Sequence, residues 1–381
     1  MPRTSSLLLA LLVLVASCDD AGSFYSTPSS LPDGPLGTVL RTESIAPFVP
    51  GTKAFRILYL SQGMNGEKIA VSGLVGIPAD PPGASGYDVV SWAHGTTGIA
   101  DVCAPSTGRR FNHDAYDVAP EVLSQGWLFV ATDYEGLGTE GVHRYLVGDS
   151  EGRSILDIVR AASHLDGVQV SGRVAFWGRS QGGHAALFAG ELAPSYAPEL
   201  EVMGTVVGAP ASHIPLIFRG AALQTGTGAA YSWLMGFAYA NAYGLPYTEL
   251  YAQDTLDVIE QPVLETDCLA ELSVYPDMLG GARLEGQVAD DPTFAAALDS
   301  NSPGKRRQPA PVRIHQGTAD TDVPPFLTEE LVSEMCAAGD RVEFVEYPGQ
   351  THVESTELHV PEMVAFTRAR FDGAPFVPTC P

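Results

Sequence analysis

VAFWGRSQGGHAALFAG, residues 174–190, is the stretch that decides the fold. It begins with an apolar run typical of a buried strand, turns at Gly178, and continues with small residues typical of the start of a helix. A strand, a sharp turn and a helix, with a serine at the turn in Gly-x-Ser-x-Gly spacing, form a nucleophile elbow. Gly178 and Gly182 fit this turn because a side chain at either position would collide with neighbouring backbone. We therefore predict that Ser180 is an enzymatic nucleophile.

The same spacing occurs earlier in the chain, in GDSEG at 148–152. The residues before it form no clean strand. Two carboxylates beside a reacting carbonyl would also oppose the negative charge that develops in acyl transfer. Asp149 and Ser150 are instead typical of the N-cap region of a helix over 152–166, where the helix dipole favours acids. We interpret Ser150 as a structural residue.

The body of the chain alternates strand-like and helix-like stretches. β-Branched and aromatic residues predict strands at 53–61, 68–78, 87–95, 126–134, 172–178, 201–210, 311–317 and 341–348. Helical patterns fall between them, at 117–125, 152–166, 182–193, 325–338 and 357–371. Short apolar strands separated by helices predict an α/β fold, with a mainly parallel sheet covered by helices on both faces. In such sheets the active site forms beyond the carboxyl ends of the strands.

One long stretch, 213–308, interrupts this alternation. It has little strand pattern but many apolar and aromatic residues, as in YSWLMGFAYANAYGLPY at 231–247. Because a connection of this length must be structured, we predict a largely helical cap or lid, inserted into a core formed by 37–212 and 309–381. The cap either packs on the sheet without a further role or covers a lipophilic substrate site.

A serine nucleophile needs a base to take its proton, and the base needs an acid to hold its tautomer. In this architecture the chain order is serine, acid, histidine. TADTDVPP follows the next-to-last predicted strand and offers Asp320, the preferred acid, and Asp322, which can also be a turn or cap residue. His352 follows the last predicted strand and is the predicted base. His359, further on, is expected to be a surface residue of a helix.

The loop WAHGTTG, residues 92–98, follows the third predicted strand. The mechanism needs an oxyanion hole, made by the backbone N–H of the residue after the nucleophile and by a second N–H from this loop. The first donor is therefore Gln181. HGTTG occupies the place of the HGGG motif of lipases and esterases, and Thr96 is the preferred second donor, with Gly95 and Thr97 as alternatives.

The N-terminus, MPRTSSLLLALLVLVASCDD, has the pattern of an export signal, because a basic residue precedes an apolar run too short to span a bilayer. The run ends in VASC, which resembles a bacterial lipobox. Residues 1–18 are thus predicted to be a lipoprotein-type signal peptide whose Cys18 is acylated; cleavage near Ala16 or Ala21 is the alternative. Ser, Pro and Gly in 19–36 predict a flexible tether. We expect an exported protein, either a cell-envelope lipoprotein or a secreted one.

Charge and cysteine content narrow the function further. The formal net charge is −24, and the lysines are confined to Lys53, Lys68 and Lys305, so nucleic acid is excluded as a partner. The negative charge favours a soluble monomer. Of the five cysteines, four remain once Cys18 is set aside. An even number suits disulfides in an oxidising compartment, and their spacing fits no zinc site.

The placed motifs together resemble an α/β-hydrolase, and more narrowly the secretory lipase family of the fungal lipase A type. The likeness extends over about residues 50–380 and includes CAPS at 103–106, TDYEGLG at 132–138, SYAPEL at 195–200 and FDG at 371–373. The resemblance implies an acyl-chain tunnel under the cap and hydrolysis of esters, including triacylglycerols, without a cofactor. It also implies two disulfides, Cys103 with Cys268 and Cys336 with Cys380.

The predicted function is that of a secreted or membrane-anchored serine ester hydrolase of lipase type, acting on acyl esters or lipids through an acyl-enzyme. A carboxylesterase for short-chain soluble esters shares this chemistry, and the aromatic cap favours the lipase. A catalytically silent, lipid-binding surface lipoprotein is the alternative from a different class. Candidates for all three members of the triad disfavour it. A peptidase is disfavoured because no gating domain is present to select peptides.

Overall fold

The computed structural model describes residues 24–108, 115–284, 291–357 and 359–380, and the structural statements below concern these residues. The predicted signal peptide and Cys18 lie outside them. None of the helices in these ranges combines the length and the hydropathy that crossing a bilayer requires.

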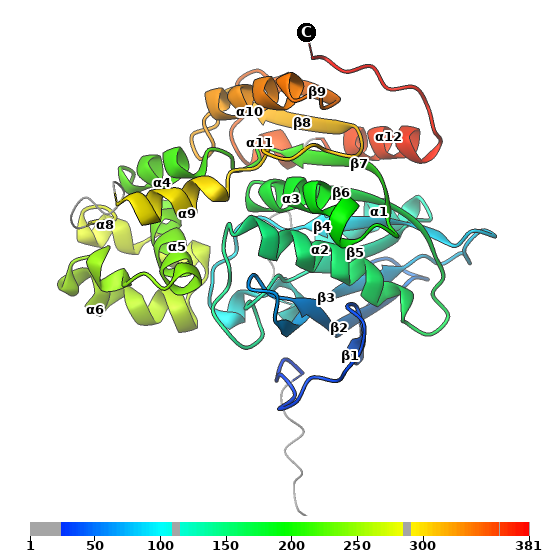
Figure 1. Ribbon diagram of the computed structural model, residues 1–381, viewed down its shortest axis with the longest axis horizontal. Helices are drawn as coiled ribbons and strands as arrows, with labels where there is room; N and C mark the ends of the chain where they lie inside the picture. Colours follow the sequence, from blue (N-terminus) through cyan, green and yellow to red (C-terminus); the bar gives the residue numbers. More distant parts are fainter. Residues whose placement is uncertain (1–23, 109–114, 285–290, 358, 381) are drawn as a thin grey trace, which may run out of the picture.

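A nine-stranded sheet in the order β1-β2-β3-β5-β4-β6-β7-β8-β9 runs through the molecule (Figure 1). Its strands are β1 (Val39–Ile45), β2 (Lys53–Gln62), β3 (Lys68–Ile77), β4 (Tyr87–Ala93), β5 (Leu128–Thr132), β6 (Val170–Arg179), β7 (Glu201–Gly208), β8 (Val312–Gly317) and β9 (Val342–Tyr347). The pairs from β1 to β3, and β3 with β5, are antiparallel, whereas every pair from β5 to β9 is parallel. The prediction of an α/β fold with a mainly parallel sheet is confirmed.

The edge strand β1 escapes the sequence patterns. Its sequence, VLRTESI, has charged residues in place of an apolar run, and none of its residues is fully buried. One of these charges, Glu43, forms an ion pair of 2.6 Å with Arg56 on β2. Charged edge strands are common because they discourage pairing with other chains.

Helices cover both faces of this sheet. On one face α2 (Gly148–Ser163), α3 (Gln181–Tyr196) and α10 (Pro325–Ala337) share a core with the strands. On the other face α1 (Ala115–Ser124) and α12 (Val360–Phe371) do the same. The remaining short helices of the core are η1 (Asp101–Cys103), η2 (Pro105–Thr107) and α11 (Glu354–Glu357). α2 begins at Gly148, so Ser150 lies in its first turn and Val147, instead of Asp149 or Ser150, is its N-cap residue.

Between β7 and β8 the chain leaves the sheet and forms the cap, which gathers at one side of the core (Figure 1). Its elements are α4 (Ile214–Ala222), α5 (Gly226–Tyr243), η3 (Tyr247–Glu249), α6 (Gln253–Gln261), the π-helical turn η4 (Pro262–Thr266), α7 (Leu269–Leu272), α8 (Tyr275–Leu279) and α9 (Pro292–Ser300). α5 lies at its centre, with Trp233, Phe237 and Tyr239 buried. A helix that is apolar all round needs neighbours on every side, and the other cap helices supply them. The cap helices therefore share an apolar core, which also includes Ile99 and the segment Tyr145–Val147 of the body.

Residues 24–36, predicted to be part of a flexible tether, include a segment that packs on the sheet. The guanidinium of Arg56 lies 4.5 Å from the centroid of the Phe24 ring, and Arg41 Nη1 donates to the Phe24 carbonyl at 3.0 Å. The Tyr25 hydroxyl lies 2.9 Å from Ser106 Oγ. Although this stretch is mostly polar, its aromatic residues Phe24 and Tyr25 bind it to the body.

Candidate active site

Ser180 lies at the turn between β6 and α3, with backbone angles φ 53° and ψ −120°. A positive φ at a residue with a side chain costs about 1–3 kcal/mol and persists where the surrounding structure enforces it. Here the Ser180 N–H donates to the carbonyl of Gly208 at 2.8 Å, and the Ser180 carbonyl accepts from the N–H of His184 at 3.0 Å. The predicted elbow geometry is thus present in the backbone.

Both glycines of the elbow are required by close backbone contacts. A Cβ atom at Gly178 would lie 2.1 Å from the carbonyl oxygen of Gly182, and one at Gly182 would lie 1.9 Å from the carbonyl oxygen of Ala93. Such distances exclude any side chain. The absence of a side chain at Gly182 brings the start of α3 against the loop that follows β4.

His352 pairs with Asp320 and not with Asp322. The distance from His352 Nδ1 to Asp320 Oδ2 is 2.7 Å, and both residues are buried. Asp320 Oδ1 accepts from the backbone N–H groups of Asp322 and Val323, each at 2.9 Å. These bonds fix the carboxylate, which in turn holds a proton on Nδ1 and leaves Nε2 as the basic nitrogen of the neutral ring. The side chain of Asp322 instead accepts from the hydroxyl of Tyr231, a cap residue, at 3.4 Å.

The sheet topology places the three predicted triad residues at one edge. Ser180 follows β6, Asp320 follows β8 and His352 follows β9. These strands belong to the parallel series β6-β7-β8-β9, so their carboxyl ends point the same way. Residues far apart in sequence thereby meet beyond the same edge of the sheet, where active sites of such folds form.

The HGTTG loop is bound to the cap. The carbonyl of Thr97 accepts from the N–H of Leu269 in α7 at 2.8 Å, whereas Thr96 Oγ1 lies 2.8 Å from the hydroxyl of Tyr145, a residue of the core. Next to Leu269, Cys268 forms a disulfide with Cys103, which follows the loop. The predicted oxyanion loop and the cap are thus held together by a covalent bond and a backbone hydrogen bond.

A second disulfide joins Cys336 to Cys380, between α10 and the C-terminal segment. Both pairings are those that the sequence resemblance implies.

Glu151 is a buried residue of the site that the sequence patterns did not bring forward. It lies on α2, and its Oε1 accepts from Gln181 Nε2 at 2.7 Å. A signal for it exists in the sequence. Glu151 falls on the same helical stripe as the buried Ile155, Ile158 and Ala162, at spacings of four, three and four residues, so its side chain faces inward.

The motifs CAPS and TDYEGLG interlock beside the HGTTG loop. Asp133 of TDYEGLG accepts from the Ser106 N–H of CAPS at 2.9 Å, from the Ser106 hydroxyl, and from Ser72 Oγ at 2.6 Å. Burial raises the pKa of Asp133 to about 6. Nearby, burial lowers the pKa of His94 to about 4, and its Nδ1 lies 2.8 Å from the carbonyl oxygen of Gly95. A neutral, buried His94 supports the loop as scaffold.

The raised pKa of Asp133 gives a pH dependence of stability with a definite sign. An unfolded aspartate has a pKa near 3.9, so between pH 4 and pH 6 the folded protein binds more protons than the unfolded chain. The contribution of Asp133 to the free energy of unfolding therefore falls as pH rises through this window. Relative to the wild type, we expect the free energy of unfolding of Asp133→Asn to rise by about 2 kcal/mol from pH 4 to pH 7. Urea unfolding of both proteins at the two pH values measures it, and an equal difference at both would contradict the raised pKa.

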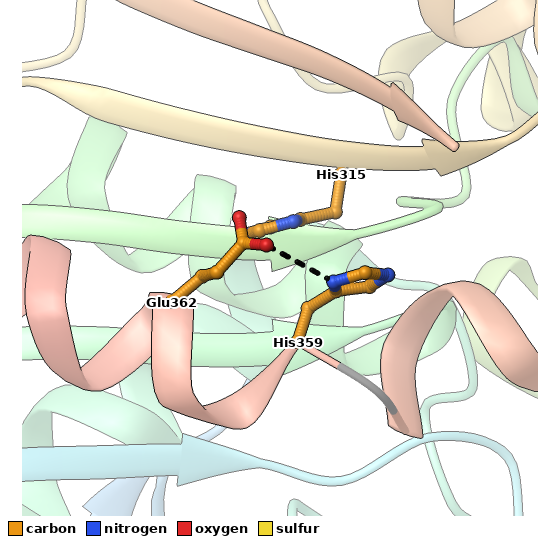
Figure 2. A group of neighbouring side chains, drawn as sticks. All are labelled: His315, His359 and Glu362. Atoms are coloured by element: carbon orange, nitrogen blue, oxygen red, sulfur yellow. Dashed lines mark ion pairs between the residues drawn. The ribbon is translucent and has the colours of Figure 1, made fainter. Parts of the chain in front are cut away.

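His315, His359 and Glu362 form a second group of titratable side chains, between β8 and α12 (Figure 2). Two histidines and a carboxylate form a ligand set that suits a metal. Most of their ligand atoms contact other protein groups, but the buried His359 Nδ1 has no hydrogen-bond partner and lies 3.4 Å from Glu362 Oε1, the contact dashed in Figure 2. His315 Nδ1 lies 2.7 Å from the Tyr347 hydroxyl, which donates to Glu362 Oε2 at 2.9 Å. Arg313 Nε donates to His315 Nε2 at 3.2 Å, and the same guanidinium contacts Glu362. Burial and this guanidinium lower the pKa of His315.

These contacts make the group a hydrogen-bonded link between α12 and the sheet. They also correct the expectation that His359 is a surface residue. Its side chain is buried, its ring centroid lies 3.3 Å from that of Tyr347, and its Nε2 lies 3.0 Å from Gln350 Oε1. A second possible cation group, His213 with Glu330 and Glu334, has nitrogen–oxygen distances of 4.0 Å and exposed glutamates. We assign a metal to neither group, because the Arg313 guanidinium lies against His315 and Glu362 in the first and the glutamates of the second are exposed.

The sequence of this chain matches a known protein family. The family model described as secretory lipase matches residues 104–379. Lipase A of Moesziomyces aphidis is 27% identical over 376 residues, which cover 92% of this chain and 79% of that protein. A secreted triacylglycerol lipase of Malassezia globosa is 27% identical over 394 residues, covering 94% and 80%. Lipase 4 of Candida albicans is 25% identical over 396 residues, covering 94% and 82%.

Solved structures share the fold. Candida antarctica lipase A in its closed state superposes with a TM-score of 0.78 at 22% identity, covering 95% of this chain and 90% of that one. A rice cell wall degrading esterase, LipA of Xanthomonas oryzae, gives a TM-score of 0.72 at 19% identity, covering 90% and 100%. The nine-stranded, mostly parallel sheet with its covering helices thus has the α/β-hydrolase fold. The family match extends over most of the chain, and the chain belongs to the secretory lipase family of carboxylic ester hydrolases.

Proposed function

We propose that this protein hydrolyses water-insoluble acyl esters, such as triacylglycerols, through an acyl-enzyme formed on Ser180. The observation that carries the proposal is the strained serine at the sheet edge that also bears the His352–Asp320 pair, next to an apolar cap. Strain at a serine without a partner base would serve no chemistry. Here the base and its acid follow strands of the same parallel series.

Each step has a residue to perform it. Ser180 Oγ attacks the ester carbonyl carbon while His352 Nε2 takes its proton, and Asp320 stabilises the resulting imidazolium. The negative oxygen of the tetrahedral intermediate accepts from the N–H of Gln181 and from that of Thr96. His352 then gives its proton to the leaving alcohol, and the acyl-enzyme remains. Water, deprotonated by His352, attacks this ester, and the fatty acid leaves as the proton returns to Ser180.

Exposed apolar side chains on the cap and near the proposed triad support a water-insoluble substrate. Leu216, Leu223, Val274 and Met278 lie on cap segments and are exposed. Phe326 and Val353, also exposed, follow Asp320 and His352 respectively along the chain. Exposed apolar side chains on the cap and on the segments that follow the two triad residues favour substrates presented at a lipid–water surface. The Malassezia globosa relative, named as a secreted triacylglycerol lipase, agrees with this class.

The test is a series of p-nitrophenyl esters, from acetate to palmitate, with a triacylglycerol emulsion alongside. The protein without residues 1–18 is compared with Ser180→Ala and with the matched variant Ser150→Ala. We expect Ser180→Ala to lose at least about 10⁴-fold in kcat, because the nucleophile is gone. Ser150→Ala loses only the hydrogen bond from its hydroxyl to Glu135 Oε2, of 2.5 Å, and keeps a kcat near that of the wild type.

The same series separates the alternatives. Long-chain hydrolysis that depends on Ser180 supports the proposal. Activity confined to acetate and butyrate would make the protein a carboxylesterase for short, soluble esters. A folded wild type that hydrolyses none of these esters would favour a lipid-binding protein without catalysis. Activity that persists in Ser180→Ala would mean that another residue is the nucleophile.

For location, we propose that acylation of Cys18 holds the enzyme at the cell envelope. The support is the sequence VASC at 15–18 and the spacing that follows it. Six peptide steps separate Cys18 from Phe24, the first described residue, which packs on the body, and six steps span at most about 20 Å. The body would then stay next to the membrane. Radiolabelled palmitate should enter the wild type and not Cys18→Ser, which should leave the membrane fraction; a mature chain that begins after Ala21 would contradict the anchor.

A further inference from the structure

Glu151 and His184 form a fully buried pair behind the nucleophile elbow. Both have 0% exposure. His184 Nδ1 lies 2.7 Å from Glu151 Oε2, and His184 Nε2 lies 2.9 Å from the carbonyl oxygen of Asn301. The other carboxylate oxygen, Oε1, accepts from Gln181 Nε2 at 2.7 Å and from the Leu146 N–H at 3.0 Å. Every polar atom of the pair therefore has a partner.

These contacts fix the number of protons in the pair. A carbonyl oxygen can only accept, so His184 Nε2 carries a hydrogen toward Asn301. The contact of 2.7 Å between Nδ1 and Oε2 needs one further hydrogen, which belongs to His184 or to Glu151. A carboxylate with a neutral imidazole has a charge of −1, and the further proton cancels it. The net charge of the pair is zero wherever the shared proton lies.

The pair acts on the side chain of Gln181. Gln181 Nε2 donates one hydrogen to Glu151 Oε1 and lies 2.9 Å from His143 Nε2. His143 Nδ1 donates to the carbonyl of Glu135 at 3.0 Å, and burial lowers the pKa of His143 to about 3, so its Nε2 is an acceptor. Both amide hydrogens of Gln181 are thus used, and the carboxamide has one orientation. The backbone N–H of this same residue is the first oxyanion donor of the proposed function.

We propose that Glu151 and His184 are positioning residues of the oxyanion hole, which fix Gln181 while adding no net charge behind it. This inference rests on the proposed function, since it takes Ser180 as the nucleophile and the Gln181 N–H as a donor. A carboxylate is a strong acceptor for the Gln181 amide, but an uncompensated negative charge there would oppose the oxyanion. The proton shared with His184 removes that charge and keeps the acceptor.

Proton counting predicts an unequal response to two isosteric changes. In Glu151→Gln, the new amide accepts from Gln181 and Leu146 and donates to His184 Nδ1, so each hydrogen bond and the zero net charge are kept. In His184→Gln, the shared proton is lost and Glu151 stays charged. We expect Glu151→Gln to lower kcat about threefold and His184→Gln to lower it on the order of 10- to 30-fold, each with KM within about twofold of the wild type.

The double variant, Glu151→Gln with His184→Gln, is the decisive measurement. The new amide on α2 can donate to the new amide on α3, which can donate to the Asn301 carbonyl, so hydrogen bonds and neutrality return. We expect its kcat to recover to within about threefold of that of Glu151→Gln. Rescue of a damaging change by a second change is a result that two independent losses of structure would not give. A double variant as slow as His184→Gln, with both melting like the wild type, would overturn the proposal.

Glu191→Gln is the matched control. Glu191 is a buried carboxylate on α3 whose hydrogen-bond partners are the Gly304 N–H at 2.7 Å and Arg306 Nε at 3.2 Å instead of Gln181 and His184. Its kcat should equal that of the wild type. If His184→Gln does not fold, Glu151→Ala carries the test in its place. The kcat of Glu151→Ala should fall on the order of 30-fold, whereas that of Glu151→Gln should fall about threefold. Equal losses of kcat in the two variants would overturn the proposal.

Different results would contradict the proposed function and the role of the Glu151–His184 pair. A wild type without esterase activity, or activity that survives Ser180→Ala, contradicts the proposed function. An active, Ser180-dependent wild type whose His184→Gln variant keeps full kcat contradicts only the role of the pair.

Discussion

Asp320→Asn lowers kcat for ester hydrolysis by about 10³- to 10⁴-fold, with little change in KM. The reason is the contact of 2.7 Å between His352 Nδ1 and Asp320 Oδ2. An asparagine amide can present its NH₂ group to Nδ1, which then loses its hydrogen, and the proton moves to Nε2. A ring protonated on Nε2 cannot take the proton of Ser180. Initial rates on p-nitrophenyl esters measure the loss, and circular dichroism checks the fold.

Asp322→Asn is the matched control for this prediction. It makes the same chemical change two residues away, but Asp322 contacts the Tyr231 hydroxyl at 3.4 Å and not His352. We expect its kcat to stay within about threefold of the wild type. A loss in Asp322→Asn as large as in Asp320→Asn would mean that the two acids share the role.

Removal of the Cys103–Cys268 disulfide, by alanine at both positions, is expected to reduce stability and kcat together. The bond closes a loop with a sequence separation of 165 residues. In the chain-entropy model such a bond contributes about 5 kcal/mol to the free energy of unfolding. It also lies next to the hydrogen bond of 2.8 Å between Leu269 and Thr97, so its loss frees the HGTTG loop and weakens the second oxyanion donor. We expect kcat to fall at least about tenfold in a protein that is still folded.

Removal of the Cys336–Cys380 disulfide separates the two effects. Its sequence separation is 44, for which the same model gives about 4 kcal/mol, and it joins α10 to the C-terminal segment without contact to the HGTTG loop. This variant should melt earlier than the wild type but keep its kcat. Calorimetry and ester hydrolysis at a temperature where both variants are folded make the comparison. Equal kcat losses in the two would show that stability alone, and not the loop, sets the rate.

The fold was predictable where local pattern and tertiary environment agree. The eight predicted strands have apolar runs because helices cover both faces of the sheet, and each run falls on an observed strand. β1 was missed because an edge strand is half exposed and needs no such run. The internal arrangement of the cap was not predictable, because its helices are short and are stabilised mainly by packing around α5.

The candidate site shows the same division. Ser180, Asp320 and His352 each follow a strand, so chain order and turn chemistry pointed to them. Glu151 and the burial of His359 depend on contacts across the fold, to Gln181 in one case and to Tyr347 in the other. A polar residue on a helix gives no local sign of the partner that it will meet. Glu151 counted only as one of the two carboxylates of GDSEG that disfavour Ser150 as nucleophile, and its contact with His184 joins two different helices.

The bond between Cys103 and Cys268 has a consequence for when the enzyme becomes active. Thiols stay reduced in the cytosol, whereas disulfides form after export to an oxidising compartment. A newly made chain inside the producing cell would therefore lack the disulfide that holds the HGTTG loop to the cap. Its kcat would be reduced as in the variant without Cys103 and Cys268. Oxidation would then act as a maturation step, and the lipids of the producing cell would meet an enzyme of reduced activity until its export is complete.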